Sequence, residues 1–124
     1  MKKISKEKSL SNKMPKILAI DTSCDDSSAA IVDGSTVQSN IVASQNQIHK
    51  QYGGVFPTVA KSEHQKNLDP TIHLAMKQAQ VAWSEIVAIA VTIGPGLAPA
   101  LEVGIEKAKE LAQKDLAISS VKEG

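Results

Sequence analysis

Residues 16–27 read Lys-Ile-Leu-Ala-Ile-Asp-Thr-Ser-Cys-Asp-Asp-Ser, a short apolar run that passes directly into a polar loop. The apolar part, Lys16–Ile20, is typical of a buried strand. Two further strand candidates follow, Ser28–Val32 and Thr36–Ala43. The turn between these two contains Gly34, which tolerates the positive φ that tight hairpins need. The sequence therefore predicts an antiparallel meander of three strands.

The third strand candidate shows the alternation of a half-buried strand. Its neighbouring positions are mostly polar, and the expected buried face consists of Val37, Ser39, Ile41 and Ala43. One buried face is enough for this strand.

The second half of the chain alternates between helix and strand patterns. Pro57 suits the first turn of a helix, where a missing N–H costs nothing. Pro70 falls within the same helical pattern, so either the helix kinks there or a new helix starts with Asp69 as its cap. The run Ile86–Thr92 is apolar nearly throughout, which predicts a strand buried on both faces. A second helix is expected from about Pro99 to Gln113. The apolar residues with helical spacing are Leu68, Ile72, Ala75, Met76 and Ala79 in the first helix and Leu101, Ile105, Ala108, Leu111 and Ala112 in the second.

Leu116–Ser119 is a candidate for a last strand. An antiparallel trio extended by parallel βα units describes an α/β fold, the ribonuclease-H-like lobe of the actin, sugar-kinase and Hsp70 architecture. A chain of 124 residues builds one hydrophobic core but not two lobes with a cleft between them. We therefore expect a flexible basic leader over residues 1–15 and a single actin-like lobe over residues 16–124.

The charge is unevenly placed, although the whole chain carries only +1. Residues 1–16 hold six lysines against one glutamate, a net charge of +5, and the remainder holds eight lysines against twelve acids, a net charge of −4. The basic end could touch RNA phosphates, or it could be a solvated leader. Every basic residue is lysine, so bidentate recognition by arginine is not available within this chain.

Composition excludes several classes of protein. The single cysteine rules out an internal disulfide and fits a reducing cytosol. No apolar run reaches the length needed to span a bilayer, and no apolar segment follows the basic start as in a secretory signal. With only 2% aromatic residues, the core must consist of aliphatic side chains. We expect Trp83 to cover the core rather than to stack on a base.

The first segment that could carry chemistry is the polar loop Asp21–Ser28. Its hydroxyls and backbone N–H groups could cradle a phosphate while a carboxylate holds Mg²⁺ or orients a water, or these residues could simply fill a turn. Cys24 has no histidine near it in sequence to act as a base, which favours a residue that fills the loop over a nucleophile.

The second such segment, residues 92–97, follows the buried strand and precedes a helix. Gly94 and Gly96 permit close approach of a ligand to the backbone, and a helix N-terminus favours anions. A tight strand-to-helix turn is the structural alternative. Ligands bind open α/β sheets at the carboxyl edge, which supports the functional interpretation.

The histidines do not form a metal-binding pattern. His49 and His64 lie 15 residues apart across a loop and the start of a helix, which matches no compact ligand spacing. His73 lies just over two turns beyond His64 and should face another direction. We expect surface or capping roles for these side chains.

Taken together, these segments resemble one family, the universal tRNA threonylcarbamoyladenosine transferases. Residues 20–26, Ile-Asp-Thr-Ser-Cys-Asp-Asp, are similar to its Glu-Thr-Ser-Cys-Asp-Glu/Asp opening. Residues 44–57 contain Ser-Gln, a histidine, Tyr-Gly-Gly-Val and a proline in the family's order, and His64 falls where the family has a helix histidine. Residues 91–97, Val-Thr-Ile-Gly-Pro-Gly-Leu, resemble its Val-Thr-x-Gly-Pro-Gly-Leu segment. The similarity covers roughly residues 16–113.

The resemblance implies an activity, cofactors and partners. The family is cytoplasmic and transfers threonylcarbamoyl from threonylcarbamoyl-AMP to N6 of adenosine 37 of tRNA. It uses a divalent metal of the iron or zinc class and an actin-like paralogue as partner. The exocyclic amine attacks the carbamoyl carbon and AMP leaves, which requires a Lewis acid and a positioned phosphate. The residues that would face the substrate phosphates are Asp21, Ser23, Asp25, Gly94, Pro95 and Gly96.

Departures from the family pattern are informative. Val121 falls where the first histidine of the family's metal-binding His-x-x-x-His pair is expected, and the sequence ends before the second. The glycine segments of the C-terminal lobe are likewise missing. Asp21 replaces the usual Glu, Thr58 the usual Glu or Ser, Ser62 falls where Arg is typical, and Glu102 adds a charge to an apolar stretch. We therefore expect a truncated member without its metal site, inactive alone.

Two alternatives belong to other functional classes. The chain could be a non-catalytic module that forms a dimer with a full-length partner through the helical face of residues 57–80. It could also be half of an actin-fold kinase or ATPase, although the Gly-Pro-Gly-Leu and Tyr-Gly-Gly-Val segments are not what such enzymes need.

Overall fold

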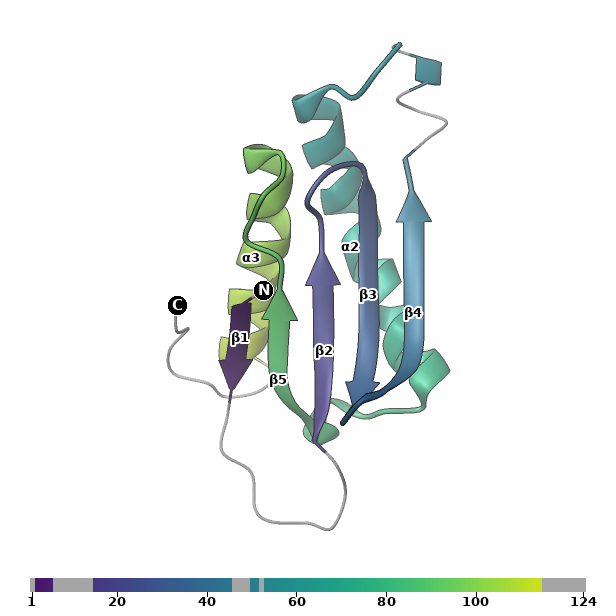
Figure 1. Cartoon of the computed structure of the whole chain (residues 1–124), viewed down its shortest axis with the longest axis vertical. Helices are drawn as coiled ribbons and strands as arrows, with labels where there is room; N and C mark the ends of the chain where they lie inside the picture. The colour runs from purple at the N-terminus through teal and green to yellow at the C-terminus, as the bar shows by residue number, and fades with distance from the viewer. Residues whose placement is uncertain (1, 6–14, 46–49, 52, 115–124) are drawn as a thin grey trace.

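A computed structural model describes residues 2–5, 15–45, 50–51 and 53–114. They form one mixed sheet with the strand order β1-β5-β2-β3-β4, shown in Figure 1. The strands are β1 (Lys2–Ser5), β2 (Lys16–Asp21), β3 (Asp26–Asp33), β4 (Thr36–Ser44) and β5 (Ile86–Val91). The helices are α2 (Pro57–Ala79), the short 3-10 helix η1 (Trp83–Glu85) and α3 (Ala98–Lys114).

The predicted meander is confirmed. Strands β2 and β3 are antiparallel, as are β3 and β4. Gly34 has a φ of 61° in the turn that joins β3 to β4. That conformation is left-handed and favours glycine, so the turn occurs where the sequence predicted it.

The predicted buried face of β4 is wrong at one residue. Ser39 is buried, but Val37 is 62% exposed. The register shifts between Ile31 and Val32, which pair with Ser39 and Val37. A bulge of one residue shifts the alternation of the strand. The side chains beyond the bulge therefore point to the opposite face of the sheet. Alternation along a sequence cannot show where a bulge falls.

Strand β5 pairs in parallel with β2 and lies in the interior of the sheet. Five of its six residues are buried, and Val87 is half-buried. The prediction of a strand covered on both faces is therefore confirmed. The candidate strand Leu116–Ser119 lies outside the described residues.

The expectation of a flexible leader is wrong for Lys2–Ser5, which forms β1. This strand pairs antiparallel with β5, with Lys2 opposite Val91 and Ser5 opposite Ala88. The outer edge of β5 presents unpaired backbone N–H and C=O groups, and these bind an extended segment whatever its side-chain pattern. Residues 6–14 lie outside the described part of the chain.

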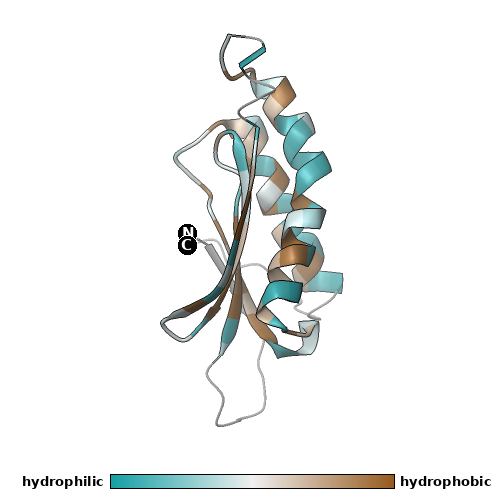
Figure 2. Cartoon of the chain, turned by 90° about the vertical axis from the view of Figure 1, so that its right-hand side faces the viewer, coloured by the Kyte–Doolittle hydropathy of each residue, from teal (hydrophilic) through white to brown (hydrophobic). Residues whose placement is uncertain are grey.

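Both long helices lie on the same face of the sheet, as Figure 2 shows. Residues with helical spacing contact the apolar side chains of that face, as the sequence predicted. Trp83 packs against this core, also as expected. Lys107 of α3 lies 2.9 Å from the carboxylate of Asp69 in α2, which joins the two helices at the surface. Buried core residues include Leu18, Ile20, Ala29, Ile31, Leu68, Ile72, Ala75, Met76, Ile89, Val91, Ala108 and Ala112.

Helix α2 runs through Pro70 without a break, so a new helix capped by Asp69 does not occur. Burial of its apolar face outweighs the hydrogen bond that a proline removes. The helix ends where Gln80 adopts a φ of 56°, and the N–H of Val81 then bonds the carbonyl of Met76. This is the Schellman termination of a helix. In the described residues, no helix is long and apolar enough to cross a membrane.

Candidate functional site

Two loops meet at one edge of the sheet. Residues 22–25 follow β2 and residues 92–97 follow β5, and parallel strands present their carboxyl ends at the same edge. The N–H of Leu97 donates to the carbonyl oxygen of Ser23 at 2.7 Å, and the N–H of Thr92 donates to the carbonyl of Ile20 at 3.1 Å. A backbone hydrogen bond therefore joins the two loops that the sequence singled out, and another joins the start of the second loop to β2.

The carboxylate of Asp21 forms hydrogen bonds with both loops. One oxygen accepts the N–H of Ser23 at 2.7 Å, and the other accepts the hydroxyl of Thr92 at 3.0 Å. Burial raises the pKa of Asp21, but the hydrogen bonds from Ser23 and Thr92 together with His64 outweigh it, so the pKa lies below the ordinary value of 3.8. Asp21 is therefore ionised at neutral pH.

The glycine at position 96 is required by the contact between the loops. A Cβ added to Gly96 would collide with the carbonyl oxygen of Ser23 and lie 2.9 Å from its Cβ. Only a residue without a side chain lets the two backbones approach this closely. The Gly94–Pro95 peptide bond is cis.

Thr22, which the sequence analysis missed, anchors the first loop to α3. It is 1% exposed, and its hydroxyl donates to the carbonyl of Ala100 at 2.7 Å while accepting the N–H of Gly104 at 3.1 Å. A Cβ on Gly104 would lie 2.7 Å from that hydroxyl oxygen. The Gly at 104 is the signal that could have indicated a close approach to the helix.

The expected surface or capping role of His64 is wrong. The side chain is 0% exposed, and it bonds both the first loop and the start of β3. Its Nδ1 lies 2.6 Å from the hydroxyl of Ser27, and its Nε2 lies 2.8 Å from the carbonyl oxygen of Cys24. A histidine in a helical pattern does not show its partners, because these come from a strand and from the loop before it, 37 and 40 residues away.

Cys24 is exposed at the tip of the first loop. Burial raises the pKa of its thiol, and the neighbouring carboxylates of Asp25 and Asp26 raise it further, against an opposing hydrogen bond from the backbone N–H of Asp25. A thiol whose pKa is raised is a poor nucleophile at neutral pH. These surroundings favour the interpretation of Cys24 as a loop residue.

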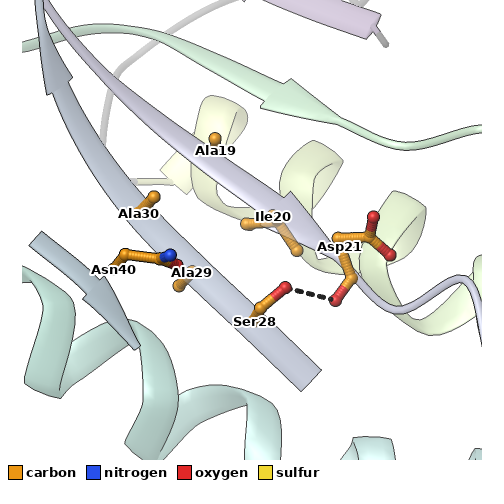
Figure 3. Close-up of a pocket in the computed structure, with 7 residues that line it drawn as sticks. All are labelled: Ala19, Ile20, Asp21, Ser28, Ala29, Ala30 and Asn40. Carbon is orange, nitrogen blue, oxygen red and sulfur yellow. Dashed lines mark hydrogen bonds between the residues drawn. The ribbon is translucent and has the colours of Figure 1, made fainter. Parts of the chain in front are cut away.

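A shallow hollow lies beside Asp21 on the face of the sheet that the two helices leave open. It holds about 150 Å³, and Figure 3 shows its lining from β2, β3 and β4. Complete small-molecule pockets are larger, roughly 300–1,000 Å³. The lining residues are Ala19, Ile20, Asp21, Ser28, Ala29, Ala30 and Asn40.

The described residues do not fit a metal site. They contain no group of three His, Cys, Asp or Glu side chains that could hold an ion. Both ring nitrogens of His64 are already hydrogen-bonded, and His73 is an exposed residue of α2. His49 lies outside the residues that the structure describes.

The sheet order, the antiparallel meander and the two joined loops define the class of protein. They form a ribonuclease-H-like lobe of the actin type. Among solved structures, YeaZ from Pseudomonas aeruginosa matches with a TM-score of 0.61 and 26% sequence identity, over 81% of this chain and 39% of that chain.

The chain belongs to the family described as TsaD: tRNA N6-adenosine threonylcarbamoyltransferase, whose profile matches residues 36–117. A relative of that name from Moorella thermoacetica is 50% identical over 97 residues, which cover 77% of this chain and 28% of the relative. Another from Thermomicrobium roseum is 53% identical over 97 residues, 77% of this chain and 27% of the relative. The chain thus spans a little over a quarter of the length of these relatives.

Proposed function

We propose that this chain forms one wall of a two-walled pocket in which a threonylcarbamoyl group is transferred from threonylcarbamoyl-AMP to N6 of adenosine in tRNA. The observation that carries the proposal is the 2.7 Å hydrogen bond from Leu97 to Ser23, which joins the two family-like loops at one sheet edge. The shallow hollow beside them, about 150 Å³, suits half of a pocket rather than a complete one.

The residues of the two loops have different tasks in this proposal. Asp21 holds the loops together, because both of its carboxylate oxygens already accept hydrogen bonds. Ser23 and Asp25 border the substrate phosphate on one side. Gly94, Pro95 and Gly96 border it on the other, just before the N-terminus of α3, where backbone N–H groups favour an anion.

These groups would favour departure of AMP. When the amine of adenosine attacks the carbamoyl carbon, the bond between that carbon and the phosphate oxygen breaks. AMP leaves with the electron pair, and the amine releases one proton to solvent. Fixed N–H donors stabilise the charge on the departing phosphate. The divalent metal of the family has no donor set in the described residues, and we assign it no step here.

The proposal is tested by mapping nucleotide binding on the ¹⁵N-labelled chain. AMP, added with and without Mg²⁺, should shift the backbone amide signals of residues 22–26 and 93–98, whereas adenosine without phosphate should leave them largely in place. Shifts that fall elsewhere, or equal shifts with adenosine, would refute a phosphate site at these loops.

A second candidate function, pairing with an actin-like partner, is supported by exposed apolar side chains on and beside α2. Leu74 is 49% exposed and Phe56 is 47% exposed. If α2 forms an interface, Leu74→Lys should abolish association with a second copy or with an actin-like relative in sedimentation velocity. A wild-type chain that sediments as a monomer with every such relative would exclude this function.

A further inference from the structure

A buried histidine fixes the direction of one peptide group in the first loop. His64 reaches up from α2, and its Nε2 lies 2.8 Å from the carbonyl oxygen of Cys24. A carbonyl can only accept, so Nε2 must carry the proton. In the neutral ring Nδ1 is then an acceptor, and the hydroxyl of Ser27 donates to it across 2.6 Å. In this one tautomer, both ring nitrogens have a hydrogen-bond partner.

The direction of the carbonyl decides where the next N–H points. The peptide bond between Cys24 and Asp25 is trans, because the cis bond in the described residues is Gly94–Pro95. In a planar trans peptide the C=O and N–H groups point in opposite directions. With the Cys24 carbonyl turned inward to His64, the N–H of Asp25 faces away from α2. It donates to the sulfur of the exposed Cys24. Sulfur is a weak acceptor, so an anionic oxygen that binds there would replace it.

The preceding peptide group is fixed from the other side. The carbonyl of Ser23 accepts the N–H of Leu97 at 2.7 Å. Two consecutive peptide groups are therefore held by partners far away in the sequence, one by the second loop and one by the helix below. This geometry removes the conformational freedom that a loop of four residues otherwise has.

We infer that His64 is a positioning residue, which orients the Cys24–Asp25 peptide so that the N–H of Asp25 is offered to an anionic oxygen at the exposed side of the loop. The identity of that oxygen, a nucleotide phosphate, rests on the proposed function. The orientation of the peptide group does not.

Four variants distinguish a positioning role of His64 from a contribution to stability alone. His64→Leu removes both hydrogen bonds, whereas His64→Gln retains an N–H donor of similar reach toward the Cys24 carbonyl. Ser27→Ala removes only the partner of Nδ1. His73→Leu is the matched control on the same helix, since His73 is exposed. Each is compared with the wild-type chain by amide NMR and by urea unfolding.

In the absence of ligand, His64→Leu should move the amide signals of Cys24 and Asp25. His64→Gln and Ser27→Ala should keep them near their wild-type positions, although Ser27→Ala also lowers stability. Nitrogen chemical shifts of the wild-type ring should show a proton on Nε2 and none on Nδ1. The opposite tautomer would overturn the inference, even if His64→Leu fails to fold. The inference would also be overturned if Ser27→Ala displaced these amide signals as much as His64→Leu does.

With AMP as the probe, His64→Leu should raise the dissociation constant about tenfold, the loss expected for one hydrogen bond to a charged group. His64→Gln should recover most of that loss, and His73→Leu should change nothing. If the ligand-free pattern holds but AMP does not bind the wild-type chain, the proposed function fails while the positioning role of His64 stands.

Discussion

At the scale of single residues, the site depends on close contacts between a few side chains and the backbone. The loop sequences predicted the location of the candidate site, because Asp21 and Gly96 lie near strand ends in segments that resemble one family. The partners of Thr22 and His64 could not be predicted, since each comes from a segment at least 37 residues away. A polar residue in a loop or helix pattern gives no sign that it will be buried.

Replacing Gly96 by alanine should weaken the junction of the loops. The added methyl group overlaps the carbonyl oxygen of Ser23, which is backbone and cannot rotate away. We expect a loss of about 1–3 kcal/mol in the free energy of unfolding, measured with urea. Ser62→Ala, at an exposed position of α2, gives the baseline. Unchanged stability in Gly96→Ala would show that the loops are not held this closely.

The contribution of Asp21 should depend on pH. Its pKa is lower in the folded chain than the ordinary 3.8, so folding favours the ionised form. That stability is fully present above the ordinary pKa and is lost as the pH falls through the folded value. Asp21→Asn should therefore lower the melting temperature at pH 7, and the difference should narrow below about pH 4. Asp26→Asn, which removes an exposed carboxylate at the start of β3, is the control. An Asp21→Asn difference in melting temperature that does not vary with pH would contradict the assigned hydrogen bonds.

At the scale of helices and strands, periodicity and turn residues predicted most of what forms. The meander, the buried strand β5 and the two helices lie where the sequence indicated them. The errors have local causes: a bulge that exposes Val37, a helix that tolerates Pro70, and the strand β1. Strand β1 forms because the edge of β5 offers backbone partners, and no side-chain pattern reports this.

Thr22 and Gly104 should prove energetically coupled. Gly104→Ala places a methyl group 2.7 Å from the hydroxyl oxygen of Thr22, and Thr22→Ala alone loses two buried hydrogen bonds, about 1–3 kcal/mol. In the double variant the overlap disappears, so its cost should be smaller than the sum of the two single costs. Urea unfolding of all four proteins measures this coupling. Strict additivity would contradict the close approach of loop and helix.

The edge strand β1 should protect β5. Ile4 lies opposite Ile89, and proline at position 4 cannot donate to the ladder. Ile4→Pro should speed hydrogen exchange at the amides of β5 that do not bond β2, with little effect on β3. Exchange rates in β5 that do not change would show that β1 does not pair in solution.

At the scale of the whole molecule, the described residues form one lobe with its loops on one edge and a shallow hollow on its open face. Relatives of the family are more than three times as long as the matched segment, which covers 28% of the Moorella thermoacetica protein. A pocket that excludes water and holds a nucleotide needs surfaces on several sides. In the proposed function, the lobe contributes some of these surfaces, and the remainder of such a relative contributes the rest.

The most direct measurement is threonylcarbamoyladenosine formation by a chimera, in which residues 16–114 of this chain replace the matching segment of the Moorella thermoacetica relative. With tRNA and threonylcarbamoyl-AMP as substrates, the chimera should form product, its Gly96→Ala variant should form much less, and the isolated chain should form none. A folded chimera without activity would contradict the role of this lobe as a pocket wall, and turnover by the isolated chain would contradict its dependence on a second wall.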